Sequence, residues 1–190
     1  MNNLSNLEPK EVFKWFYELN QHPRSSGKEK EVSDFLVKFA KDRNLEVYQD
    51  EILNVIIKKP GTPGYENSQT LIIQGHMDMV CVKADGSDHN FDTDPIEMVI
   101  DGDRIRANNT TLGGDDGIAV AYGLAILDAD DIPHPPIELL ITTNEETGMD
   151  GAMALTADHL SGTRLLNLDT EEEGIFLVSC SGGSNIECTI

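Results

Sequence analysis

Three apolar segments of the sequence, TLIIQ, ELLITT and RLLNL, are each followed closely by side chains that can bind a metal ion or transfer a proton. In chain order these side chains are His76, Asp78, Glu145, Glu146 and Asp169. If the three segments are parallel strands of one sheet, their carboxyl ends share an edge, where such sheets bind ligands. Crowded carboxylates raise each other's pKa, and a divalent cation relieves the repulsion. Imidazole with carboxylates suits zinc, manganese or cobalt better than calcium.

A further pair of carboxylates, Asp115 and Asp116, lies between the first two segments, within the sequence LGGDDG (112–117). The glycines permit unusual backbone conformations and a close approach of neighbouring groups. A phosphate-binding loop is not indicated, because no Lys-Ser or Lys-Thr follows the glycines and the neighbouring charges are negative. A serine nucleophile is not indicated either, since the sequence contains no Gly-x-Ser-x-Gly motif.

Each motif also has an ordinary structural explanation. His76 could be a structural histidine, and the carboxylates of 115–116 could favour a helix N-terminus electrostatically. Residues 145–146 could be a solvated pair, and residues 171–173 have the composition of a solvated charge cluster. The spacing of His76 and Asp78 is more specific, because residues two apart in a strand point the same way. Asp78 can therefore orient the imidazole of His76, and it is the joint placement of the motifs that favours a metal site.

The hydrophobic pattern predicts alternating helices and strands. Helices are expected over 8–20, over 115–130 and over 150–158. Another helix is expected to run from the loop HPRSSGKEK to residue 43, with Ser25 and Ser26 as its N-caps. Strands are expected at 45–49, 54–59, 70–74, 135–143, 164–168, 175–180 and 184–190, with a hairpin at 96–106. This order indicates an α/β fold with a mixed, mostly parallel central sheet flanked by helices on both faces.

Composition restricts the partners. The chain has 190 residues, 34 of them acidic and 14 basic, and a formal net charge of −20. This charge repels nucleic acids and anionic membranes, so neither is expected as a partner. No apolar stretch approaches the roughly 20 residues that span a bilayer, and the N-terminus does not resemble a signal peptide. Three cysteines without zinc or disulfide spacing are typical of the reducing cytoplasm, where we expect the protein to be located.

Five stretches carry a resemblance to a known family. They are HPRSSGKEKEVSDFL (22–36), GHMDMVCVK (75–83), TLGGDDGIAVAYGLAIL (111–127), LLITTNEETGMDGA (139–152) and LLNLDTEEEG (165–174). In this order they resemble the aminoacylase/carboxypeptidase-type family of co-catalytic zinc peptidases, and within it the dipeptidase branch. One small departure is Gly114, where this branch often has alanine. The resemblance implies two divalent metal ions, zinc foremost with manganese or cobalt as alternatives, and hydrolysis of dipeptides that include the Xaa-His type.

The resemblance also implies roles for individual residues. His76 and Asp169 would bind one ion and Glu146 the other, with Asp115 bridging the two. The peptide bond after Asp115 would be cis. Asp78 would orient His76. Glu145 would be the general base that takes a proton from water and passes it to the leaving amine.

One ligand of the family is not recognisable in the sequence. The second ion has Asp115 and Glu146, but none of the remaining histidines follows a buried strand. In the family this histidine comes from a late segment, after an inserted lid domain that supports dimerisation and substrate binding. We therefore expect residues 1–190 to be the N-terminal part of a catalytic domain, weakly active or inactive alone, whose parent protein is a homodimer. The alternatives are an N-acyl-amino-acid deacylase, a tripeptidase, or a non-catalytic acidic module that binds metal.

Overall fold

The structure is a computed structural model, and it describes residues 4–170 and 174–179. In chain order its elements are α1 (Lys10–Leu19), α2 (Lys30–Asp42), β1 (Glu46–Gln49), β2 (Val55–Lys59), β3 (Leu71–His76), β4 (Met98–Asp101), β5 (Arg104–Ala107), α3 (Gly114–Asp128), β6 (Ile137–Thr142), α4 (Glu145–Gly148), α5 (Asp150–Ala154), the 3₁₀ turn Ala157–His159 and β7 (Arg164–Asn167). Within the described ranges, no helix is both long and apolar enough to cross a membrane.

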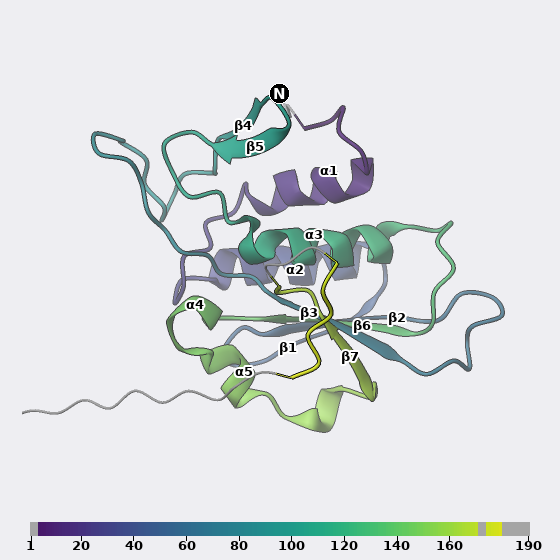
Figure 1. The fold of residues 1–190 in the computed structure, drawn as a ribbon. Helices are drawn as coiled ribbons and strands as arrows, with labels where there is room; N and C mark the ends of the chain where they lie inside the picture. The colour runs from purple at the N-terminus through teal and green to yellow at the C-terminus, as the bar shows by residue number, and fades with distance from the viewer. Residues whose placement is uncertain (1–3, 171–173, 180–190) are drawn as a thin grey trace, which may run out of the picture.

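A five-stranded sheet in the order β1-β2-β6-β3-β7 forms the centre of the fold (Figure 1). Strand β3 is parallel to its neighbours β6 and β7, whereas β2 is antiparallel to β1 and β6. The predicted mixed sheet is confirmed, and its parallel pairings lie at the three strands that lead into the polar motifs. The predicted hairpin, β4 with β5, forms a separate two-stranded sheet.

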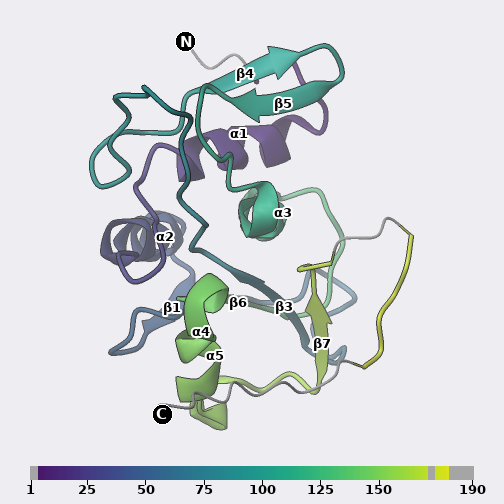
Figure 2. The ribbon, with the colours of Figure 1, turned by 60° about the vertical axis from the view of Figure 1, so that its left-hand side comes forward.

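Helices cover both faces of the sheet, as predicted. Helix α2 packs against β1 and β2, α3 packs against β3, and α1 lies over α3 (Figures 1 and 2). On the opposite face, Ile56, Ile72 and Leu140 form a small apolar cluster against Leu155 and Leu160, which belong to the segment around α5 and the 3₁₀ turn. Most of the core therefore lies between the sheet and the layer of α1, α2 and α3.

The composition of α3 and β6 explains why these elements lie in the interior. All six residues of β6 are buried, because the strand has a neighbour on each side and apolar residues over both faces. Helix α3 is rich in alanine and glycine, which lets its backbone approach the sheet closely. At Gly123 an added Cβ would lie 2.3 Å from Cδ1 of Leu139. A larger side chain at this position would push α3 away from the sheet.

Several predicted boundaries differ from the structure. The predicted helix over 150–158 is the short α5 followed, after a break, by a 3₁₀ turn. Residues 145–148 form a helical turn where no helix was predicted. Residues 175–179 form no strand. Residue 180, the predicted strand 184–190 and the charge cluster 171–173 lie outside the described residues. Helix α2 has Glu29 at its N-cap, without a side-chain capping bond, so the prediction of a serine cap is wrong.

Candidate metal centre

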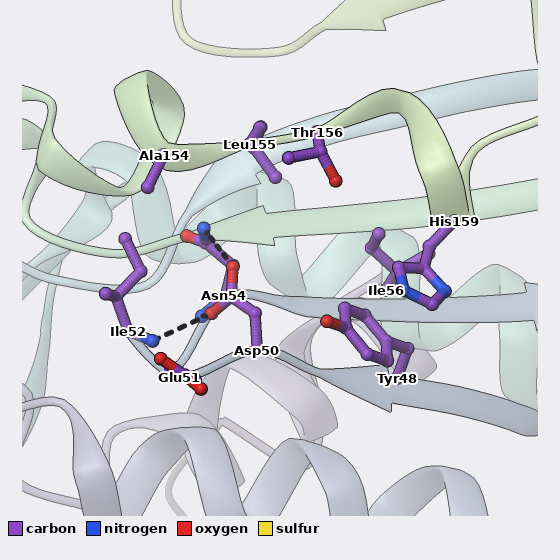
Figure 3. Close-up of a pocket in the computed structure, with 10 residues that line it drawn as sticks. All are labelled: Tyr48, Asp50, Glu51, Ile52, Asn54, Ile56, Ala154, Leu155, Thr156 and His159. Atoms are coloured by element: carbon purple, nitrogen blue, oxygen red, sulfur yellow. Dashed lines mark hydrogen bonds between the residues drawn. The ribbon is translucent and has the colours of Figure 1, made fainter.

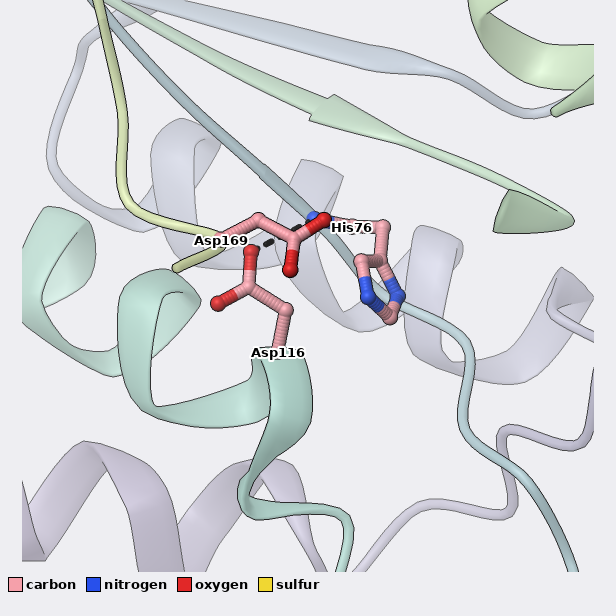
Figure 4. Close-up of side chains that lie close together, drawn as sticks. All are labelled: His76, Asp116 and Asp169. Carbon is pink, nitrogen blue, oxygen red and sulfur yellow. Dashed lines mark hydrogen bonds between the residues drawn. The ribbon is translucent and has the colours of Figure 1, made fainter. Parts of the chain in front are cut away.

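The parallel register brings the polar motifs to one edge of the sheet. His76 is the last residue of β3 and pairs with Thr142, the last residue of β6. The segments that follow both strands therefore leave the sheet side by side. Asp169 follows β7, which pairs with the other side of β3. Figure 4 shows the carboxylates of Asp116 and Asp169 beside His76.

Two overlapping groups of potential ligands share His76. In one group, ligand atoms of His76, Asp115 and Glu146 lie within 4.8 Å of one another. In the other, ligand atoms of His76, Asp116 and Asp169 lie within the same distance (Figure 4). Imidazole nitrogen together with carboxylate oxygen is a donor set that suits zinc. The residues present therefore fit a divalent metal ion.

Hydrogen bonding leaves one nitrogen of His76 available to a ligand. Its Nδ1 lies 3.0 Å from the backbone oxygen of Asp78 and 3.3 Å from Oδ1 of the same residue. Both are acceptors, so Nδ1 carries the proton. Nε2 faces the open side of the site, 3.2 Å from Oδ1 of Asp115 and 3.8 Å from Oε2 of Glu145. The side chain of His76 is buried, whereas that of Asp115 is 69% exposed, and the site is thus accessible from one side.

Asp78 is placed behind His76, where an orienting residue would be. Its Oδ1 accepts the backbone N–H of Glu145 at 3.0 Å, and its Oδ2 accepts the backbone N–H of Glu146 at 3.3 Å. The hydroxyl of Ser26 donates to Oδ2 at 2.7 Å. Burial alone would raise the pKa of Asp78, but hydrogen bonds from His76 foremost, then from the Glu145 backbone and Ser26, lower it to about 2. Asp78 thus joins the end of β3 to the start of α4 as a carboxylate.

The site has an excess of negative charge. Burial raises the pKa of Glu145, and the charges of Asp169 and Glu146 add to the effect. Burial also raises the pKa of Glu146, followed by the charge of Asp115. Burial disfavours a charged His76, but its hydrogen bond to Asp78 and the surrounding carboxylates raise the pKa of His76 to about 9. Such a cluster favours any cation that can enter it.

Asp116 was not predicted as a site residue, although it belongs to the same LGGDDG motif. Its side chain is buried, and its Oδ2 accepts the backbone N–H of His76 at 3.2 Å (Figure 4). Burial raises the pKa of Asp116 to about 7, and the charge of Asp169 contributes to the rise. An added Cβ at Gly75 would lie 2.6 Å from this oxygen. The paired aspartates were the available signal, but which of them would face inward depends on the backbone at the start of α3.

That backbone is irregular. The bond between Asp115 and Asp116 is cis, as the resemblance implied, and both residues have non-helical dihedral angles. Gly113 precedes them with φ +67°, in the left-handed region that favours glycine. The guanidinium of Arg24 fills the space beside this glycine and donates to its carbonyl oxygen at 2.6 Å. Arg24 is buried, and its role was also not predicted from the polar loop that contains it.

Two adjacent glycines of this turn provide a matched test. An added Cβ at Gly113 would lie 2.2 Å from Nη2 of Arg24, whereas at Gly114 the nearest atom would be Cδ2 of Leu112 at 4.0 Å. We expect Gly113→Ala to lower the free energy of unfolding by about 2–4 kcal/mol through overpacking and a strained φ. Gly114→Ala should change it by less than about 0.5 kcal/mol. Urea unfolding followed by fluorescence of Trp15, the single tryptophan, measures both. Equal stabilities of the two variants would contradict the described turn.

Two cavities near the sheet differ in their relation to this site. One, of about 300 Å³, is lined by residues of β1, β2 and the segment after α5, including the stacked rings of Tyr48 and His159 (Figure 3). None of its lining residues belongs to the metal cluster. A second cavity of about 210 Å³ is lined by both Glu145 and Asp169, together with apolar side chains such as Leu140. The second cavity therefore adjoins the predicted base.

Comparison with known proteins identifies the class. Residues 72–185 match the family described as Peptidase family M20/M25/M40, and the chain belongs to this family. It is 39% identical over 183 residues to the cytosol non-specific dipeptidase of Escherichia coli (strain K12), a match that covers 96% of this chain and 38% of that protein.

Solved structures show the same relationship. The chain is 42% identical to aminoacylhistidine dipeptidase from Vibrio alginolyticus, with a TM-score of 0.88 over 90% of this chain and 35% of that one. It is 27% identical to aminopeptidase PepT from Bacillus cereus, with a TM-score of 0.69 over 86% of this chain and 44% of that one. The chain thus spans less than half the length of each of these relatives.

Proposed function

We propose that the protein carrying these residues hydrolyses dipeptides, including the Xaa-His type, at a centre of two divalent metal ions. The observation that carries the proposal is the cluster of one imidazole and four carboxylates at the edge of the sheet, whose ligand atoms fall into two overlapping groups. Membership of a peptidase family and the two dipeptidases among the relatives support the reaction class. The alternatives of a deacylase, a tripeptidase or a non-catalytic acidic module have less support from these similarities.

We assign His76 and Asp169 to one ion, Glu146 to the other and Asp115 to both. One group places Asp115 beside both His76 and Glu146, which supports Asp115 as the shared ligand, and the other group places Asp169 beside His76. Zinc is the proposed metal, with manganese and cobalt sharing its ligand preferences. That a further histidine completes the second ion's ligands stays a prediction.

When bound, such ions lower the pKa of a water molecule and polarise the scissile carbonyl. Glu145 is the proposed general base. Its carboxylate lies beside Nε2 of His76 and is partly exposed, so it can accept a proton from water and pass it to the leaving amine. Asp78 keeps the proton of His76 on Nδ1, which leaves Nε2 free to bind.

The cellular location and the partners of the protein are proposed on the same basis. The Escherichia coli relative is named a cytosolic enzyme, and together with the cysteine pattern this supports a cytoplasmic location. A dipeptide is the proposed small-molecule partner. A homodimer of the parent protein, formed through a lid domain, stays a prediction from the family resemblance.

The test is metal-dependent hydrolysis by the natural protein that carries these 190 residues. With zinc present, we expect cleavage of Ala-His, seen as free histidine by chromatography. Removal of metal with 1,10-phenanthroline should abolish it, and added zinc, manganese or cobalt should restore it. An N-acetyl-amino acid and a tripeptide, assayed in parallel, distinguish the alternative activities. Absence of dipeptide cleavage by the metal-loaded protein would contradict the proposal.

A further inference from the structure

The loop between α1 and α2 contacts three of the four segments that lead into the candidate metal centre; the segment after β7, which carries Asp169, is the fourth. This 24–29 loop, defined as residues 24–29, reaches the segment after β3, the turn before α3 and the segment after β6. Three of its side chains, Arg24, Ser26 and Glu29, contact residues that adjoin or belong to the site. None of these side chains belongs to either group of potential metal ligands.

Arg24 connects the first two segments. Its Nη1 donates to the carbonyl oxygen of Met77 at 3.1 Å, and its Nη2 donates to that of Gly113 at 2.6 Å. Met77 lies between His76 and Asp78, and Gly113 lies two residues before Asp115. The planar guanidinium holds its donors in a fixed geometry, so it sets the spacing between the two segments. Added Cβ atoms at Gly113 and Gly117 would both collide with it, which shows that the turn is shaped around this group.

Glu29 holds the third segment. Its Oε1 accepts the backbone N–H of Asn144 at 2.9 Å and that of Gly27 at 2.9 Å. Asn144 has φ +49° and immediately precedes the predicted base, Glu145. Glu29 is buried, and a buried carboxylate that accepts backbone N–H groups makes strong, directional hydrogen bonds. It therefore restrains the residue from which α4 begins.

Ser26 acts on Asp78 directly. The hydroxyl donates to Oδ2 at 2.7 Å, which is shorter than the 3.3 Å contact from the Glu146 backbone N–H to the same oxygen. Asp78 is fully buried, and loss of a donor to a buried carboxylate leaves it less well held. Because Asp78 contacts Nδ1 of His76 and the N–H groups of α4, a displacement of its carboxylate would reach both.

We propose that the 24–29 loop is a positioning element for the metal centre and that Ser26 is a positioning residue that acts through Asp78. This inference rests on the proposed function, because it concerns the geometry of the same site. The sequence pattern predicted Ser26 as an N-cap of the following helix. Its hydroxyl is instead directed at Asp78, a residue 52 positions away in the sequence.

The test compares Ser26→Ala with Ser26→Thr and Ser25→Ala in the natural protein. Ser25 is a matched control, because its hydroxyl lies 3.0 Å from Sγ of Cys81, whereas the hydroxyl of Ser26 donates to the carboxylate of Asp78. Loss of partners that orient metal ligands costs about 10–100-fold in metal affinity or activity. We expect Ser26→Ala to weaken zinc binding and lower kcat by about 10-fold, with KM nearly unchanged. Ser26→Thr should restore both, and Ser25→Ala should resemble the unaltered protein.

Two further measurements separate positioning from folding. Urea unfolding should give similar midpoints for Ser26→Ala and Ser25→Ala. The visible absorption of cobalt-loaded protein should change in Ser26→Ala and not in Ser25→Ala. If Ser26→Ala binds zinc and turns over like Ser25→Ala, the positioning role is wrong while the proposed function stands. If the unaltered protein binds neither zinc nor cobalt, the proposed function fails and the positioning role fails with it.

Discussion

Glu145→Gln is expected to lower kcat for dipeptide hydrolysis by about 10²–10⁴-fold, the usual contribution of a general base. The amide cannot accept the proton of a water molecule, but it has nearly the same shape. Because Glu145 lies beside the ligand groups and is not one of their members, metal binding should persist. Steady-state kinetics gives kcat, and elemental analysis gives the number of ions per chain.

A matched change elsewhere controls for the loss of a negative charge. Glu51 is exposed and lies outside the metal cluster, so Glu51→Gln should leave kcat within about twofold of the unaltered protein, as expected for a surface substitution. If Glu145→Gln loses bound metal as well as activity, Glu145 is a metal ligand rather than the general base. Unchanged activity in Glu145→Gln would show that another group takes the proton.

His76→Asn is expected to weaken zinc binding by about 100-fold or more. Loss of a residue that only orients a ligand costs 10–100-fold, and His76 is the residue that both ligand groups share. Isothermal titration with zinc, or competition with a chromophoric chelator, measures the affinity. We expect hydrolysis to fall in parallel, since the proposed reaction needs the metal to generate a nucleophile from water.

His159→Asn is the control for His76→Asn. His159 stacks on Tyr48 at a ring separation of 3.5 Å and lines the cavity of Figure 3 rather than the metal site. Its replacement should leave zinc affinity unchanged. A small effect of His76→Asn, equal to that of His159→Asn, would contradict the assignment of His76 as a ligand. Circular dichroism of both variants establishes that the comparison is made between folded proteins.

The hydrophobic pattern of the sequence was sufficient to predict the strands that lead into the site. The strand predicted at 70–74 is β3, that at 135–143 contains β6 and that at 164–168 contains β7. Strands β3 and β6 lie inside the sheet and are largely or fully buried. The apolar run of β7 also predicted a buried strand, but β7 lies at the edge of the sheet and its four residues are exposed. The convergence of His76 and the segment 145–146 followed from one rule, that parallel strands present their carboxyl ends at the same edge.

Boundaries and irregular segments were predicted less well. Residues 145–148 form a helical turn, and the predicted helix 150–158 is interrupted. Short helices carry little periodicity, and their ends are set by contacts with the rest of the chain. Gly151, for example, is the second residue of α5 and lies so close to the end of β6 that an added Cβ would lie 2.4 Å from the carbonyl oxygen of Thr143. Such contacts depend on residues that are distant in the sequence or on exact backbone paths.

The sequence by itself determined which chemical groups gather at the edge of the sheet, because residue type and strand order follow from local patterns. It also determined the family, through motifs that include His76 and Asp115. Only the tertiary structure decided how these groups are held. Asp116 is turned inward by the backbone at the start of α3, and Ser26 is directed at Asp78 by a loop far away in the chain. Hydrogen bonds of this kind depend on distances of a few tenths of an ångström between segments, which no local pattern encodes.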